Sequence, residues 1–165
     1  MRYIMLAALL ALPTTPVFAD NLERLETATE LGGKHLTTII LSRVPELEPN
    51  LPNWDWDDDY RSAARCFLDD LESSQGADHV EKYISAVEAY AAVPVTSLAQ
   101  TENQPPEMST PVVMAAMQSC GVMQQVMKRM QESGFMGAMM NEATMSKLGR
   151  SVSYTHLTLP TTPYV

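Results

Sequence analysis

The chain has 165 residues, a length that fits a single domain, and its 20 acidic residues against 11 basic ones give a net charge of −9 at pH 7. Binding to nucleic acids or to anionic lipid headgroups needs clustered lysine and arginine, so this acidic composition argues against both kinds of partner. We expect three segments along the chain: a signal peptide at 1–19, a helical domain at 20–151 and an appended tail at 152–165.

The amino terminus has the pattern of a secretory signal peptide. Arg2 provides a positive charge, residues 4–12 form an apolar run, and Val17-Phe18-Ala19 ends in a small residue typical of a cleavage site. The apolar run is too short for a membrane anchor, which needs about 20 apolar residues. We therefore expect cleavage after Ala19, a mature chain that does not enter the membrane, and a periplasmic or secreted location.

Apolar side chains then recur at helical spacing from Asn21 to Arg43, which predicts a first helix. Gly32 and Gly33 interrupt the pattern, and each costs about 1 kcal/mol relative to alanine inside a helix. We expect the helix to be kinked or closely approached at these glycines. Three prolines in the stretch 44–53 favour an extended connection over the surface.

Four aspartates cluster between Asp55 and Asp59, flanked by Trp54 and Trp56. A calcium-binding loop would need a glycine where Tyr60 stands and a glutamate where Cys66 stands, so that motif fails. Acids at the beginning of a helix accept hydrogen bonds from free N–H groups and interact with the positive end of the helix dipole. The cluster therefore predicts the start of a second helix, which ends near 73–76.

A third helix follows after only two or three residues. Asp78 and Glu81 have the spacing of a capping box, and Val80, Tyr83 and Ile84 begin an apolar face that ends before Pro94. Because the connection is so short, we expect the second and third helices to pack as an antiparallel hairpin.

The stretch 110–132 reads as a single central helix. Thr110 is a suitable cap, and Pro111 suits the first turn, where its missing N–H has no partner to lose. Apolar residues gather on one half of this helix, with Cys120 near the middle, so we expect the helix to be the hub of the fold and Cys120 to be buried. A final short helix would follow Ser133-Gly134 and run to Leu148. The predicted fold class is all-α, an irregular bundle of four to five helices cross-linked by one disulfide.

The two cysteines, Cys66 and Cys120, predict that disulfide. An exported chain with two cysteines has one pairing available, here between the second helix and the central helix. A catalytic or redox-active thiol would require a CxxC spacing or a positioned base, and the sequence contains neither. We therefore interpret the pair as a structural cross-link.

Ten of the twelve methionines lie between Met108 and Met145. Methionine is a flexible filler of hydrophobic cores, and core packing is the interpretation that the helical spacing favours. The same residues could instead form an adaptable interaction surface, because methionine also lines binding grooves. A third interpretation is a site for copper(I), which selects thioether ligands, with Met123, Met127 and Met130 on one helix face.

No catalytic, phosphate-binding or zinc-binding motif occurs in the chain, and outside the tail only His35 and His79 offer imidazole groups. We therefore expect no enzyme and no cofactor, but a non-enzymatic interaction or structural module whose partner would be another protein. A methionine-rich copper(I)-binding protein is one alternative. A small acidic helical plan with one disulfide, together with the fragment Cys66-Phe67-Leu68, resembles periplasmic acid-stress chaperones. That resemblance implies a chaperone-like binder as a further alternative and assigns no role to any residue.

The carboxyl-terminal segment differs from everything before it. Residues 152–162, VSYTHLTLPTT, resemble one reading frame of the transposase mosaic-end adapter used in sequencing libraries. The segment is rich in threonine and proline and abandons the helical period, as an appended segment would. We therefore expect residues from Val152 onward to be an artefact and leave them out of the functional argument.

Overall fold

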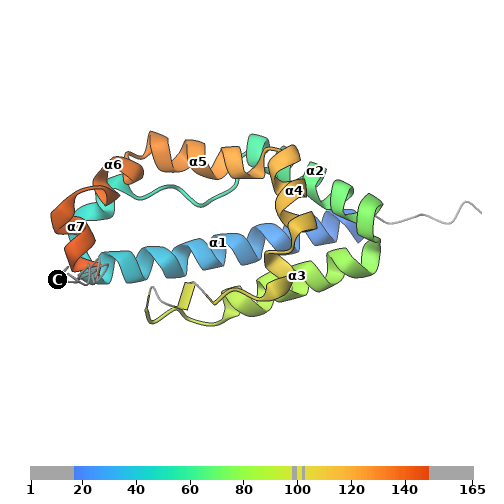
Figure 1. The fold of residues 1–165 in the computed structure, drawn as a ribbon, viewed down its shortest axis with the longest axis horizontal. Coiled ribbons are helices and arrows are strands. Elements are labelled where there is room, and N and C mark those ends of the chain that lie inside the picture. The colour runs from blue at the N-terminus through green and yellow to red at the C-terminus, as the bar shows by residue number, and fades with distance from the viewer. Residues whose placement is uncertain (1–16, 98–99, 102, 149–165) are drawn as a thin grey trace, which may run out of the picture.

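The structure, a computed structural model, describes residues 17–97, 100–101 and 103–148, and every regular element among them is helical (Figure 1). The all-α prediction is therefore confirmed. The helices are more numerous than expected, because the stretch after residue 110 is divided into four short ones. In chain order the elements are α1 (Val17–Arg43), η1 (Pro45–Asn50), α2 (Asp58–Gln75), α3 (Ala77–Ala92), η3 (Pro106–Met108), α4 (Pro111–Ser119), α5 (Val122–Glu132), α6 (Phe135–Met139) and α7 (Glu142–Lys147).

The long helix α1 is the axis of the molecule. It runs along the length of the fold, with α3 on one side and α5 on the other (Figure 1). Its most extensive contact is with α3, and it also packs against α2 and η1. The prediction that the 110–132 segment is the hub is therefore wrong, because α1 is long enough to contact both ends of the bundle while that segment is split.

Helix α1 continues through Gly32 and Gly33 without a break, and the expected close approach occurs at Gly33. A Cβ atom built there would lie 2.4 Å from Cγ of Trp54, a distance that real Cβ contacts do not reach. Trp54 also donates a hydrogen bond from Nε1 to Oγ1 of Thr37, at 3.0 Å. The missing side chain at Gly33 thus lets the loop after η1 lie against α1.

The prediction that the stretch 44–53 is extended is only partly correct. It begins with the 3-10 helix η1, whose first residue is Pro45, and only then becomes extended. Proline is compatible with the first turn of a helix, and the buried side chains of Val44 and Leu47 hold this turn against the core.

Helices α2 and α3 form the predicted hairpin, joined at Gly76, which has a φ of 87°. The acidic start of α2 is confirmed, since Oδ1 of Asp57 accepts a hydrogen bond from the Tyr60 N–H at 2.8 Å. The capping box at α3 is wrong: its cap is Gly76, with no side-chain cap, and Glu81 binds Arg24 instead. An ion pair with a neighbouring helix has replaced the local cap.

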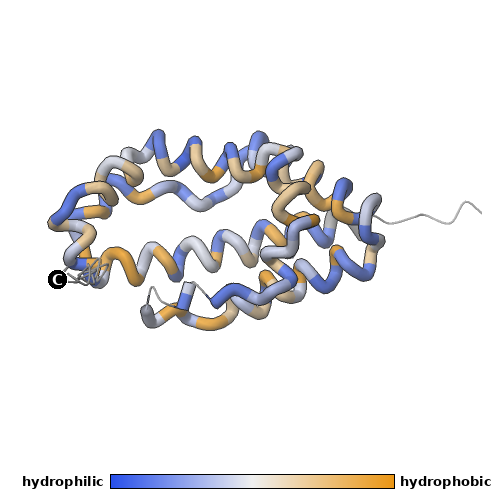
Figure 2. Tube along the Cα trace, in the orientation of Figure 1, coloured by the Kyte–Doolittle hydropathy of each residue, from blue (hydrophilic) through white to orange (hydrophobic). Residues whose placement is uncertain are grey.

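Two hydrophobic clusters lie along the long axis. The larger cluster joins α1, α2, α3 and α4, and its fully buried members include Phe67, Leu71 and Ile84. The smaller cluster closes the other end of the molecule with Ile40, Val44, Leu47, Phe135 and Leu148. Hydrophobic and hydrophilic residues alternate along the helices, as amphipathic helices require (Figure 2).

The predicted final helix is divided into α6 and α7 at Asn141, whose Oδ1 accepts a hydrogen bond from the Ala143 N–H at 3.0 Å. Three expectations concern residues that lie wholly or largely outside the described part of the chain: the signal peptide, the end of the last helix at Gly149, and the adapter-like tail. Helix α1 begins at Val17, ahead of the expected cleavage point after Ala19.

Candidate functional site

The segment that we predicted as one continuous helix bends at Gly121. Gly121 has a φ of 79° and a ψ of 10°, a left-handed conformation that glycine adopts at low cost. Helix α4 ends at Ser119, with Cys120 as its cap, and α5 starts after Gly121 in a new direction. A helical projection drawn across residues 110–132 therefore places the side chains of α5 on the wrong faces, and the prediction of one helix is incorrect.

Several methionines in this part of the chain lie at the surface. None of the described methionines is fully buried, and five of them are exposed: Met114, Met123, Met127, Met136 and Met140. Four others are partly buried against the two clusters: Met108, Met117, Met130 and Met139. The core-packing interpretation is wrong for the exposed five. The buried side chains are Val113 and Ala116 in α4, Val122 in α5 and Phe135 in α6.

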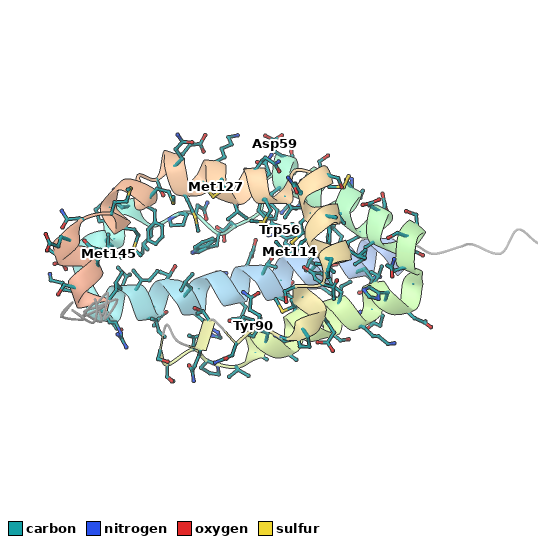
Figure 3. The ribbon with its side chains drawn as sticks, viewed as in Figure 1. Trp56, Asp59, Tyr90, Met114, Met127 and Met145 are labelled. Carbon is teal, nitrogen blue, oxygen red and sulfur yellow. A yellow bond between two sulfur atoms is a disulfide. The ribbon has the colours of Figure 1, made fainter. Side chains whose placement is uncertain are left out.

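Three of the exposed methionines line one groove between α4 and α5. Met114 comes from α4, and Met123 and Met127 come from α5 (Figure 3 shows Met114 and Met127). The groove has a volume of about 620 Å³ and is open to solvent; its remaining lining residues are Pro111, Ala115, Gln118 and Gln124. None of these lining residues is charged. We call this feature the methionine groove.

The disulfide fixes one wall of the methionine groove. The predicted pairing of Cys66 with Cys120 is present, with 5.6 Å between the two Cα atoms, and it ties the end of α4 to α2. The expectation that Cys120 is buried is wrong: Cys120 is half-buried and Cys66 is exposed. The bond therefore lies at the surface beside the bend at Gly121, where it holds the carboxyl end of α4.

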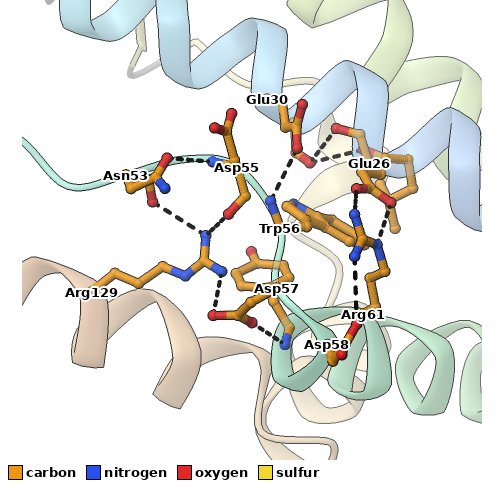
Figure 4. A network of polar contacts seen from close by, with 12 residues as sticks. Glu26, Glu30, Asn53, Asp55, Trp56, Asp57, Asp58, Arg61 and Arg129 are labelled. Atoms are coloured by element: carbon orange, nitrogen blue, oxygen red, sulfur yellow. Dashed lines mark hydrogen bonds and ion pairs between the residues drawn. The ribbon is translucent and has the colours of Figure 1, made fainter.

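Arg129 fixes the other wall. Its guanidinium donates hydrogen bonds to the carbonyl oxygens of Asn53, at 3.2 Å, and Asp55, at 2.7 Å, and it pairs with the Asp57 carboxylate at 3.0 Å (Figure 4). The guanidinium carbon also lies 4.7 Å from the centroid of the Tyr60 ring. Four contacts from one side chain hold α5 against the loop and the start of α2.

The pKa values of the groups that contact Arg129 are shifted in the directions that this geometry implies. The pKa of Asp57 is lowered, first by the hydrogen bond from the Tyr60 N–H and then by the positive charge of Arg129. Burial raises the pKa of Tyr60, so its hydroxyl group stays neutral and its ring is available to the cation. Lys128, on the same helix, adds a longer pair of 3.9 Å with Asp59.

The copper(I) triad that the sequence indicated is only partly assembled. Met123 and Met127 line the methionine groove, but Met130 packs against the smaller hydrophobic cluster and is not part of the lining. The third methionine in the lining is instead Met114, which belongs to α4 on the other side of the bend at Gly121. The sequence analysis did not group Met114 with Met123 and Met127 because it assumed one straight helix over 110–132. Gly121 was the residue in that stretch that could have indicated a bend. Among the described residues, no group of three or more His, Cys, Asp or Glu side chains has an arrangement suited to a metal ion.

None of the helices in the described part of the chain combines the length and the apolar composition that a membrane span requires. Comparison of the sequence and structure with known protein families, with curated proteins and with solved structures found no match.

Proposed function

We propose that this protein is an exported, non-enzymatic interaction module that binds an amphipathic helical segment of another protein in the methionine groove. The observation that carries the proposal is the placement of Met114, Met123 and Met127 in one open groove. Burying such side chains against a partner removes apolar surface from water. The transfer of a methionine side chain from full exposure to full burial contributes about 1.5–3 kcal/mol, and these three side chains are 39–48% exposed, so each contributes roughly half of that. A monomer gains nothing from exposing them.

The chemistry of the lining indicates what kind of partner fits. Thioether side chains are flexible and polarizable, so they adapt to leucine, isoleucine or aromatic side chains of different shapes. Gln118 and Gln124 add amide groups that both donate and accept hydrogen bonds. Since the chain carries a net charge of −9, a segment with basic residues on its outer face would be attracted to it over long range.

The supports of the groove also favour binding. The Cys66–Cys120 bond and the contacts of Arg129 hold both walls before any partner arrives, so little ordering entropy is lost on association. The same disulfide supports an exported location, because such bonds persist in oxidising compartments.

The test uses a synthetic amphipathic helix of about 15 residues with leucine on one face and lysine on the other. We expect it to bind the disulfide-bonded protein in a fluorescence anisotropy titration, and to bind less tightly as salt is added. Changing Met114, Met123 and Met127 to glutamine should weaken binding by at least about tenfold, or 1.4 kcal/mol. The matched control changes Met136 and Met140, which are exposed outside the groove, and should bind as the wild type does. Equal loss in both variants, or no binding by the wild type, would contradict the proposal.

A second candidate function is copper(I) binding, because three thioethers line the same groove. A metal that binds only the folded state stabilises it by RT ln(1 + [L]/Kd), about 2.7 kcal/mol at a hundredfold excess over Kd. Changing Met114, Met123 and Met127 to leucine separates the two candidates, since leucine keeps the apolar lining but cannot bind copper. We expect this variant to retain peptide binding and copper(I) to leave the melting temperature of the wild type unchanged. A rise of several degrees that the leucine variant lacks would favour the metal function.

A further inference from the structure

The chain has no free thiol that an oxidant could attack before it attacks a methionine. Its only two cysteines, Cys66 and Cys120, are joined to each other in the disulfide. A free thiolate is the side chain that peroxides oxidise most readily, and an exposed thioether is the next sulfur group to react. A peroxide that reaches this protein therefore finds its sulfur targets among the exposed methionines.

Exposure divides the described methionines into groups that differ in their access to an oxidant. Four of them pack against the two hydrophobic clusters and are partly covered there: Met108, Met117, Met130 and Met139. Five are exposed, and three of these line the methionine groove. The other two, Met136 and Met140, are exposed outside the groove. Because oxidation follows exposure, we expect the exposed five to react before the packed four.

The reaction adds one oxygen atom to each thioether. A lone pair of the sulfur attacks one oxygen of hydrogen peroxide, so that an S–O bond forms while the O–O bond breaks. The proton on the attacked oxygen passes to the leaving hydroxide, which departs as water. The sulfur loses two electrons and the peroxide gains them. The product, methionine sulfoxide, is a polar side chain that accepts hydrogen bonds.

Sulfoxides would change the character of the methionine groove more than that of the fold. None of its lining residues is charged, and the only side-chain donors among them are the amides of Gln118 and Gln124. A sulfoxide oxygen that is covered by the apolar face of a partner loses its water without gaining a donor from that face. The core itself is built from other residues, since no exposed methionine belongs to either hydrophobic cluster.

We propose that Met114, Met123 and Met127 form an oxidation site for peroxides, and that their conversion to sulfoxides releases the helical partner from the methionine groove. This inference rests on the proposed function and adds a means of regulating it. The groove binds its partner while its three sulfur atoms are thioethers and loses the partner once they carry oxygen.

The test repeats the titration of the amphipathic peptide after treatment of the protein with hydrogen peroxide. Mass spectrometry identifies the sample in which the five exposed methionines are oxidised and the four packed ones are not. We expect the oxidised wild type to bind the peptide at least about tenfold more weakly than the untreated protein. Its circular dichroism spectrum should stay unchanged, because the core is intact.

Two variants assign the effect to the groove. With Met114, Met123 and Met127 changed to leucine, the lining stays apolar but has no sulfur to oxidise, so peroxide should leave peptide binding unchanged. Each of these changes made singly should reduce the loss of affinity in part, which tests the assignment if the triple variant binds weakly from the start. The matched control changes Met136 and Met140 to leucine, and it should lose affinity as the wild type does.

The outcomes separate this inference from the proposed function. If the untreated wild type binds the peptide and the oxidised wild type binds it equally tightly, the inference is overturned and the proposed function stands. The inference is also overturned if the leucine variants of the groove lose as much affinity on oxidation as the wild type, or if the groove methionines are not oxidised ahead of the packed four. A failure of the untreated wild type to bind overturns both.

Discussion

The indole ring of Trp54 packs on the backbone of α1 at Gly33, in space that any Cβ atom would occupy. The contact joins the loop after η1 to α1.

Gly33→Ala should lower the free energy of unfolding by about 1–3 kcal/mol, because the added methyl group overlaps Trp54 and forces the loop to move. Gly32→Ala is the control at the neighbouring position, where a Cβ meets only Ala91 at 4.0 Å. It should raise stability by about 0.5–1 kcal/mol, since alanine favours the helix. Denaturant titrations measure both changes. Similar effects of the two substitutions would show that the Trp54 contact is not tight.

Breaking the disulfide should lower stability by about 4 kcal/mol, because the bond closes a loop with a sequence separation of 54 residues in the unfolded chain. Urea titrations with and without reductant provide the measurement. Since Cys66 is exposed, reductant should reach the bond without unfolding the protein. Mass spectrometry of the non-reduced protein should find no free thiol, and unchanged stability after reduction would be inconsistent with a structural role.

Arg129→Met should lower the free energy of unfolding by about 1–3 kcal/mol, because it removes hydrogen bonds to two carbonyl oxygens and an ion pair from a side chain that is only 11% exposed. Lys128→Met removes the same charge one residue away. Its ion pair is 3.9 Å long and its side chain is 52% exposed, so we expect a change within about 0.5 kcal/mol. Thermal and denaturant melts compare the two variants, and equal effects would show that net charge alone matters.

Acidification should weaken the contact between α1 and α3. Arg24 bonds to both carboxylates of Glu81 and Glu88, and these bonds lower the pKa of each glutamate below its ordinary value of 4.5. The stabilisation is therefore complete above about pH 4.5 and is lost as the pH falls through the lowered pKa values. Both carboxylates are more than a third exposed, so each pair contributes less than about 1 kcal/mol.

Arg24→Met should flatten the dependence of stability on pH between about pH 5 and pH 3. Lys82→Met, an equal change of charge at an exposed position of α3, should leave that dependence as in the wild type. A dye for exposed apolar surface, added in the same titration, examines the chaperone-like alternative. Strong dye binding near pH 3, together with suppressed aggregation of a second protein, would favour that alternative over the methionine groove.

Local chemistry was enough to predict the helical class, the hairpin and the disulfide. The apolar faces of α2 and α3 repeat at 3.6 residues within single unbroken helices, so the side chains on those faces are the ones that are buried. Asp57 caps α2 with its own side chain and needs no distant partner. Two cysteines allow only one pairing, so Cys66 and Cys120 could be joined from the sequence alone.

Tertiary structure decided the features on which the proposed functions depend. Gly121 redirects the chain by adopting a left-handed conformation, and only the packing around it selects that conformation over a helical one. Glu81 had two available partners, a cap at its own helix and Arg24 on α1, and the distant cation was favoured because α1 lies alongside α3. The exposure of Met114, Met123 and Met127 follows from the new direction of α5, since helical spacing groups side chains on one face but does not determine which face meets the core.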